Sequence, residues 1–127
     1  MLTAQTAERI LSEYGAAWVE QDPDKILTLF AEDGTYHEHA FHRPKCGHAE
    51  IRAYWQSKVC EQQSDIHFIP LVHFVCGDVL IAEWDAFFKN ASTHMQVHIR
   101  EVAIMEIANE KIVSLREYWQ SAKTPLP

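Results

Sequence analysis

The second half of the chain is a run of extended segments joined by short turns, and this pattern limits the folds open to it. Four stretches with alternating side chains are expected to form strands: Ile66–Val75, Val79–Phe88, Gln96–Ile107 and Ile112–Gln120. The first pair flanks Cys76-Gly77-Asp78 and the second pair flanks Ala108–Lys111, and both connections have the composition of hairpin turns. Strands joined by hairpins pair antiparallel, so this half of the chain predicts an antiparallel meander.

The first third of the chain has the periodicity of helices instead. Apolar residues recur at intervals of three and four, which places one set on a single helix face: Ala7, Ile10, Leu11, Tyr14, Ala17 and Trp18. Asp22 and Pro23 are typical of an N-cap and a first helical position, so a second helix is expected there. A short strand over Thr35–Ala40 and a third helix from Gly47 follow. Helices first and a meander afterwards predict an α+β fold, with the helices packed on a curved, mainly antiparallel sheet.

Length and charge narrow the class of protein. The 127 residues suit one domain over residues 1–127, and the net charge of -7 disfavours both nucleic acid and anionic membranes as partners. No apolar stretch approaches the length that spans a membrane, and the N-terminus lacks the pattern of a signal peptide. Three cysteines (Cys46, Cys60 and Cys76) cannot all pair within one chain, which favours a reducing, cytoplasmic location.

The stretch from Phe30 to Tyr54 carries the most specific signal. It begins Phe-Ala-Glu-Asp-Gly-Thr-Tyr-His-Glu-His and places Glu38 on a short strand, followed by a glycine and another helix. This layout resembles the ketosteroid isomerase and SnoaL-like branch of the nuclear transport factor 2-like superfamily. The resemblance covers nearly the whole chain and is strongest between Tyr14 and Trp55. It implies a cone-shaped, cystatin-like fold that encloses a pocket, with Glu38 as the general base and Tyr14 as the oxyanion-hole tyrosine.

Acidic residues interrupt the apolar rows that the strands should turn towards the helices. Alternation places Glu101 in one such row and Glu117 in another, and the register that the resemblance implies adds Glu83 and Asp85. An ionised carboxylate in an apolar interior is costly, so its pKa rises, and neighbouring acids raise it further. A carboxyl that stays protonated can donate a hydrogen bond to a developing oxyanion. Alternatively, these acids lie at a wet rim or pair with arginines: Arg52, Arg100 or Arg116.

The leading hypothesis is a cofactor-free acid–base enzyme that acts on a small hydrophobic carbonyl compound as an isomerase, cyclase or dehydratase. Glu38 would remove a proton next to the carbonyl, and Tyr14 would hold the enolate oxygen with help from Glu101 or Glu117. The candidate substrate-binding residues are Trp18, Tyr54, Trp55, Glu83, Asp85 and Trp119.

The resemblance breaks at two positions. The oxyanion-hole aspartic acid of the isomerases falls at or beside Ala103, and an aspartate of the SnoaL-like cyclases falls at Gln120. Neither side chain can replace a carboxyl group, so we do not expect the strict chemistry of either class.

Two other readings stay open. His37, His39 and His42 lie within six residues, and alternation puts the first two on one strand face, where they could share a zinc or iron ion. Glu38 would then point to the opposite face, so the metal site and the base compete. The other reading is a non-catalytic module for ligand binding or dimerisation. A homodimer is expected in each case, through an apolar outer patch made of Trp84, Phe88, Val102 and Ile104.

Overall fold

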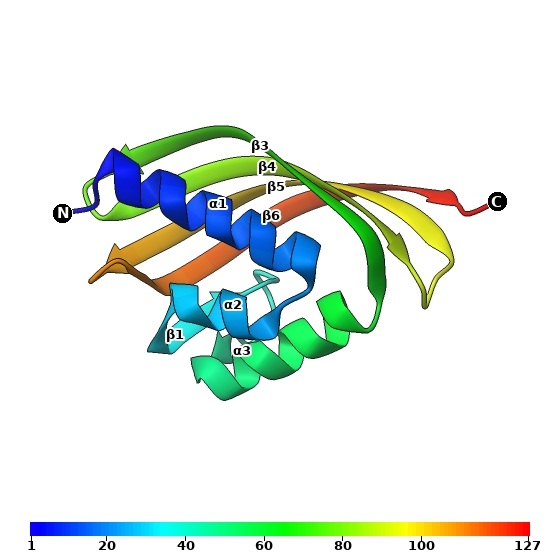
Figure 1. The fold of residues 1–127 in the computed structure, drawn as a ribbon, viewed down its shortest axis with the longest axis horizontal. Coiled ribbons are helices and arrows are strands. Elements are labelled where there is room, and N and C mark those ends of the chain that lie inside the picture. The colour runs from blue at the N-terminus through cyan, green and yellow to red at the C-terminus, as the bar shows by residue number, and fades with distance from the viewer.

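The computed structural model describes residues 1–127 (Figure 1). In chain order the elements are α1 (Ala4–Glu20), α2 (Pro23–Leu29), β1 (Phe30–His37), β2 (Lys45–Cys46), α3 (Gly47–Trp55), one π-helical turn (Gln56–Cys60), β3 (Gln63–Cys76), β4 (Val79–Asn90), β5 (Met95–Ala108) and β6 (Lys111–Pro125). The sheet order is β2-β1-β6-β5-β4-β3. Figure 1 shows the curved sheet with the helices on one side of it, which confirms the predicted α+β architecture.

The helices begin where the sequence indicates. The Thr3 side chain accepts a hydrogen bond from the Thr6 amide and caps α1, while Asp22 accepts from the amides of Asp24 and Lys25 and caps α2. Pro23 occupies the first turn of α2, where its missing N–H leaves no bond unmade. The apolar face of α1 is buried along its length, so burial on the sheet supplies most of the stability of this helix.

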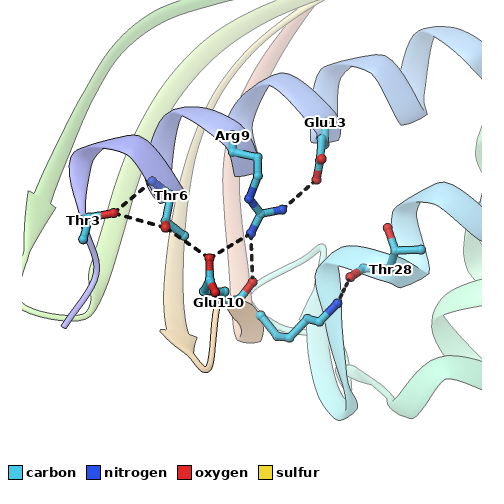
Figure 2. Close-up of polar contacts among 7 residues, drawn as sticks. Thr3, Thr6, Arg9, Glu13, Thr28 and Glu110 are labelled. Carbon is cyan, nitrogen blue, oxygen red and sulfur yellow. Dashed lines mark hydrogen bonds and ion pairs between the residues drawn. The ribbon is translucent and has the colours of Figure 1, made fainter.

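Polar contacts fix the start of α1 to the turn between β5 and β6 (Figure 2). The Thr6 hydroxyl donates to Oε1 of Glu110 over 3.4 Å, and the Arg9 guanidinium donates to the Glu110 carbonyl over 3.3 Å. Nearby, Lys111 donates to the carbonyl of Thr28 at the end of α2. These contacts hold α1 in one position over the sheet, so the side chains further along its buried face also have fixed places.

The long strands form the predicted meander, and their register sets the inner face. β3 to β6 pair antiparallel in succession, and β1 joins the sheet by parallel pairing with β6. Trp84, Glu101 and Trp119 lie side by side on three neighbouring strands, and Ala103 and Glu117 form an adjacent row. Both predicted inner acids, Glu101 and Glu117, are therefore on the face that the helices cover.

The first strand differs from the prediction. We expected Thr35–Ala40, whereas β1 begins at Phe30 and ends at His37. Its pairing with β6 shifts register between Phe30 and Thr35, so an irregular segment extends the strand backwards. The short partner β2 pairs only with Thr35 and Tyr36, and the pairing of β1 with β6 ends at His37, where the chain bends away.

The expected outer patch is also wrong in part. Trp84 is fully buried and Phe88 is 4% exposed, because both belong to the inner row of β4. The exposed large apolar side chains gather instead on β3: Ile69, Leu71, Val72, Phe74 and Val75. None of the helices combines the length and the apolar content needed to cross a bilayer.

Candidate active site

A small cavity lies between the helices and the inner face of the sheet. Its volume is about 110 Å³, and twelve residues from both layers line it. Half of the lining is aromatic: Tyr14, Trp18, Tyr36, Tyr54, Trp55 and Trp119. The polar part comprises two carboxyl groups, Glu101 and Glu117, with Lys58 and Gln63. The structure therefore brings together the predicted tyrosine, both inner acids and all four predicted aromatic residues.

The aromatic walls hold one another in place. The Tyr14 ring meets the Trp55 ring edge-on at 6.0 Å and lies 5.1 Å from the Trp84 ring, and the rings of Tyr36 and Tyr54 are 5.2 Å apart. Such contacts fix ring orientation beyond what simple burial does, because the edges and faces of aromatic rings carry opposite partial charges. The cavity is thus a preformed site with rigid apolar walls.

The two carboxyl groups in this cavity have no cationic partner. Glu101 is 3% exposed and Glu117 is 8% exposed, and no lysine or arginine forms an ion pair with either. The three arginines considered from the sequence are engaged elsewhere: Arg52 with Asp24, Arg100 with Asp85 and Arg116 with Glu106. The alternative in which arginines neutralise the acids is therefore excluded for Glu101 and Glu117, whereas it is confirmed for Asp85, which pairs with Arg100.

Burial controls the protonation of the pair. Burial raises the pKa of Glu101 well above the usual range of a carboxyl group, and the neighbouring Glu117 raises it further. The pKa of Glu117 is also raised by burial, although hydrogen bonds from Glu101, Tyr36 and Tyr14 oppose this effect. Two such groups in contact cannot both ionise without strong repulsion, so the pair retains a proton at neutral pH.

Two phenols connect to this pair. The Tyr14 hydroxyl donates to Oε1 of Glu117 over 3.4 Å, and it also lies 3.4 Å from the Tyr36 hydroxyl. Burial, followed by the nearby Glu117, raises the pKa of both tyrosines well above its ordinary value. Both phenols therefore stay protonated and can act as hydrogen-bond donors at the base of the cavity.

Glu38 lies beside the cavity and not in its lining. It occupies the bend directly after β1 and is 7% exposed, with its carboxylate 3.5 Å from Lys45 Nζ and 3.9 Å from His42 Nδ1. Its negative charge lies close enough to raise the pKa of both Tyr54 and Glu117.

Two predicted substrate-binding acids do not reach the cavity. Glu83 and Asp85 lie on the outer face of β4, because the inner row of that strand is formed by Trp84 and its alternate neighbours. Asp85 accepts two hydrogen bonds of 2.8 Å from Arg100, and this pairing lowers the pKa of the carboxyl to about 2. The expectation that Glu83 and Asp85 face inwards is therefore wrong.

The histidines do not form the metal site considered from the sequence. His37 ends β1, and its Nε2 lies 2.6 Å from the carbonyl of His42. The rings of His39 and His42 stack in parallel at 3.9 Å, an arrangement in which their nitrogens do not converge on one point. No three histidine, cysteine or acidic side chains come together in a group that could hold a metal ion.

Sequence reasoning missed two polar residues near the site. Tyr36 was not a candidate, although it precedes Glu38 by two residues and would share a face with it on a regular strand. Lys45, the partner of Glu38, comes from the far side of the intervening loop, and no local pattern links the two.

Trp119 separates the inner cavity from two open hollows. One hollow, of about 310 Å³, is bordered by Trp119 and Glu101, and the other, of about 370 Å³, by Trp119 and Glu117. Because Trp119 is 39% exposed, a ligand larger than the inner cavity could lie against its ring while its polar end contacts the carboxyl pair.

A helix-covered curved sheet that encloses a cavity, with Tyr14 in the lining, is the arrangement that the sequence resemblance implied, whereas the acids of this cavity were indicated by strand alternation. The family model described as a SnoaL-like domain matches residues 11–115. The chain belongs to the SnoaL-like family. No curated protein matches its sequence.

Solved structures share the fold of this SnoaL-like protein at low sequence identity. SalBIII, an epoxide hydrolase/cyclase-like enzyme of pyran ring formation in salinomycin, is 24% identical, with coverage of 94% of this chain and 95% of its own and a TM-score of 0.81. A Bacillus subtilis protein described as an isomerase is 20% identical, with 94% and 90% covered and a TM-score of 0.79. A hypothetical protein with a ketosteroid isomerase-like fold from Catenulispora acidiphila, in complex with trimethylamine, is 23% identical, with 86% and 83% covered and a TM-score of 0.76. These likenesses show the SnoaL-like fold and leave the reaction to be argued from the site.

Proposed function

We propose that this protein is a cofactor-free acid–base enzyme that acts on a small hydrophobic carbonyl compound, as an isomerase, cyclase or dehydratase. The observation that carries the proposal is the buried Glu101–Glu117 pair, which has no cationic partner and lies beside two phenols. Glu38, paired with Lys45 at the edge of the same interior, supplies the separate base. A protonated acid and an ionised base in one site are the requirements of enolisation.

In the proposed reaction, the Glu38 carboxylate removes a proton from the carbon next to the carbonyl. The electron pair of that bond moves into the carbon skeleton, and negative charge develops on the carbonyl oxygen. Tyr14 and the protonated carboxyl of the pair donate hydrogen bonds to this oxygen, and both do so in a water-poor environment where such bonds are strong. Return of the proton to another carbon completes an isomerisation. In a dehydration the enolate expels a hydroxyl group from the next carbon, and this group takes up the proton held by Glu38 and leaves as water.

The size of the site limits the substrate. A cavity of about 110 Å³ is small against the roughly 300–1,000 Å³ of pockets that enclose a drug-sized ligand. We therefore propose that the carbonyl end of the substrate enters the cavity and that the remainder lies along Trp119. The trimethylamine complex of the Catenulispora acidiphila protein adds small amines to the ligand classes that we propose for this cavity.

The test is deuterium uptake from heavy water into a panel of small enolisable ketones. We expect Glu38→Gln to slow the uptake by about 10²–10⁴-fold, the usual contribution of a positioned base. Glu32→Gln is the matched control, because Glu32 is an exposed carboxylate on the strand that leads to Glu38. Equal uptake by the Glu38 variant and the wild type would refute this base, and no uptake with ligand still bound would favour the non-catalytic binding module.

Cellular location and assembly are proposals of the same kind. All three cysteines are unpaired, which supports a reducing, cytoplasmic location. A homodimer is supported by the exposed apolar side chains of β3 at the edge of the sheet.

A further inference from the structure

One carboxylate oxygen in the cavity has no partner. Oε2 of Glu101 is buried and makes no hydrogen bond, although the side chain as a whole is only 3% exposed. Its neighbours across the sheet are Trp84 on β4 and Trp119 on β6. A buried acceptor without a partner is destabilising by about 1–3 kcal/mol. This oxygen has almost no accessible surface, and the indole Nε1 of Trp84 is buried and unpartnered in the same way, so a ligand in the cavity must meet the carboxyl pair at oxygens other than this one.

The other walls of this cavity suit a cation. Six aromatic rings line it, and the faces of such rings attract ammonium groups through their negative electrostatic potential. The outer side of this ring cluster already interacts with one cation, since Lys45 Nζ lies 5.7 Å from the centre of the Tyr54 ring. A carboxylate together with several ring faces is the usual composition of a site for alkylammonium groups.

The protein does not supply a cation to the carboxyl pair itself. The titratable and charged groups that face this interior come from several elements: Tyr14 on α1, Tyr36 on β1, Glu38 after β1, Lys45 on β2, Tyr54 on α3 and Lys58 on the π-helical turn. Lys45 is paired with Glu38, and Lys58 is exposed at the edge of the cavity. The negative charge of an ionised pair would therefore be uncompensated until a ligand brings a positive charge.

We propose that the cavity binds a small organic ammonium ion, held by Glu101 and the surrounding rings, in exchange for a proton of the Glu101–Glu117 pair. A cavity of about 150 Å³ accommodates benzene, so the 110 Å³ here suits a headgroup of roughly four to six heavy atoms. This inference rests on the proposed ligand cavity but not on the proposed reaction. The released proton passes to the buffer, and the pair, which held one proton between its two carboxyl groups, is left with both carboxylates ionised beside the ammonium ion.

Proton exchange has two consequences that a neutral ligand would not share. Ammonium binding strengthens as the pH rises, because the proton that must leave is held less tightly. The same ion removes the protonated acid that the proposed enolisation uses, so it acts as a competitive inhibitor of that reaction.

The experiment is isothermal titration calorimetry with choline and with its neutral isostere 3,3-dimethyl-1-butanol, in phosphate and in Tris at one pH. We expect choline to bind at least about tenfold more tightly than the isostere, a difference of about 1.4 kcal/mol. The difference between the binding enthalpies in the two buffers should correspond to the release of close to one proton for choline and of none for the isostere. Glu101→Gln should weaken choline binding at least about tenfold and leave the isostere unchanged. Glu83→Gln, on the outer face, should bind both as the wild type does.

Equal affinity for the two probes, no choline binding by the wild type, or choline binding without proton release would each overturn the inference. The comparison of the two probes on the wild type does not depend on whether the Glu101 variant folds. Deuterium uptake measured on the same preparation separates the two proposals. Uptake without choline binding would overturn only the ammonium inference, and choline binding without uptake would overturn only the proposed reaction.

Discussion

The Tyr14 hydroxyl donates to Oε1 of Glu117 over 3.4 Å, and this bond joins the first helix to the last strand. Tyr14 lies in the middle of α1, whose start is tied to the Glu110 turn, while Glu117 lies on the strand that follows that turn. The proposed oxyanion donor and its carboxyl neighbour are therefore positioned by the same pair of elements.

Removal of this phenol should slow catalysis more than it destabilises the fold. Tyr14→Phe keeps the ring contacts and deletes one oxyanion donor, so we expect the deuterium uptake rate to fall by about 10²–10³-fold. The lost hydrogen bond should lower the free energy of unfolding by only about 1 kcal/mol. Tyr118→Phe, at an exposed position on β6, is the stability control, and it should leave the free energy of unfolding unchanged. If the rate falls only as far as the loss of folded protein accounts for, Tyr14 is not a catalytic donor.

The carboxyl pair should make the protein less stable as the pH rises. The folded-state pKa values of Glu101 and Glu117 are raised, so between the unfolded-state value near 4.5 and the folded values the native state binds more protons than the unfolded state. Stability falls with increasing pH in that window, by about 1.4 kcal/mol for each unit of pKa difference. Urea unfolding from pH 4.5 to 8 should show this slope in the wild type.

Glu101→Gln is the matching variant, because it removes one titrating group and keeps the shape of the side chain. The free energy of unfolding of the variant minus that of the wild type should increase steadily between pH 4.5 and 8. A constant difference over that range would mean that Glu101 titrates normally. Glu83→Gln, on the outer face of β4 and outside the carboxyl pair, is the control variant for the same titration.

Gly15 is a helix position where alanine should destabilise the fold. Gly→Ala in a helix interior usually gains about 1 kcal/mol. Here a Cβ at Gly15 would lie 2.8 Å from Cε1 of the Phe68 ring and even closer to Cδ1, so the ring must move. Because Phe68 packs against Tyr14 and Trp84, we expect a net loss of about 1–3 kcal/mol on chemical denaturation. In the double variant with Phe68→Leu, the Gly15→Ala change should cost less than it does alone, and additive losses would contradict the proposed clash.

Self-association should depend on β3, which pairs only with β4 and leaves its other edge free. An open edge that carries apolar side chains favours pairing with a second copy of itself. We expect a dimer in sedimentation at micromolar concentration and a shift towards monomer in Phe74→Lys, at a side chain that is 62% exposed. Phe41→Lys removes an even more exposed ring elsewhere and should stay dimeric. A monomeric wild type would refute the proposed assembly.

The two buried acids could be placed from sequence because they lie in regular strands. Alternation within β5 and β6 is uninterrupted around Glu101 and Glu117, so their neighbours identify the inner face. For Glu83 and Asp85 the face was taken from the resemblance, and the observed register of β4, in which Trp84 pairs with Glu101, reverses it. A shift of one residue in register exchanges the two faces of a strand completely.

Glu38 and its surroundings were less accessible to sequence reasoning. The end of a strand depends on where its partners end, and β2 is only two residues long. The local sequence therefore predicted a strand where the chain bends, and it could not show that Lys45 returns to pair with Glu38. The same bend stacks the His42 ring on the His39 ring, so His37 and His39 do not share one strand face as the sequence predicted.

The bend after β1 divides the proposed machinery between two kinds of structure. The acids Glu101 and Glu117 belong to long paired strands, whereas Glu38 sits in a short connection that is free of sheet pairing. Substitutions between residues 38 and 44 can therefore alter where the base reaches without disturbing the core. In evolutionary terms, a new substrate or a new site of proton removal is most accessible through changes in these seven residues.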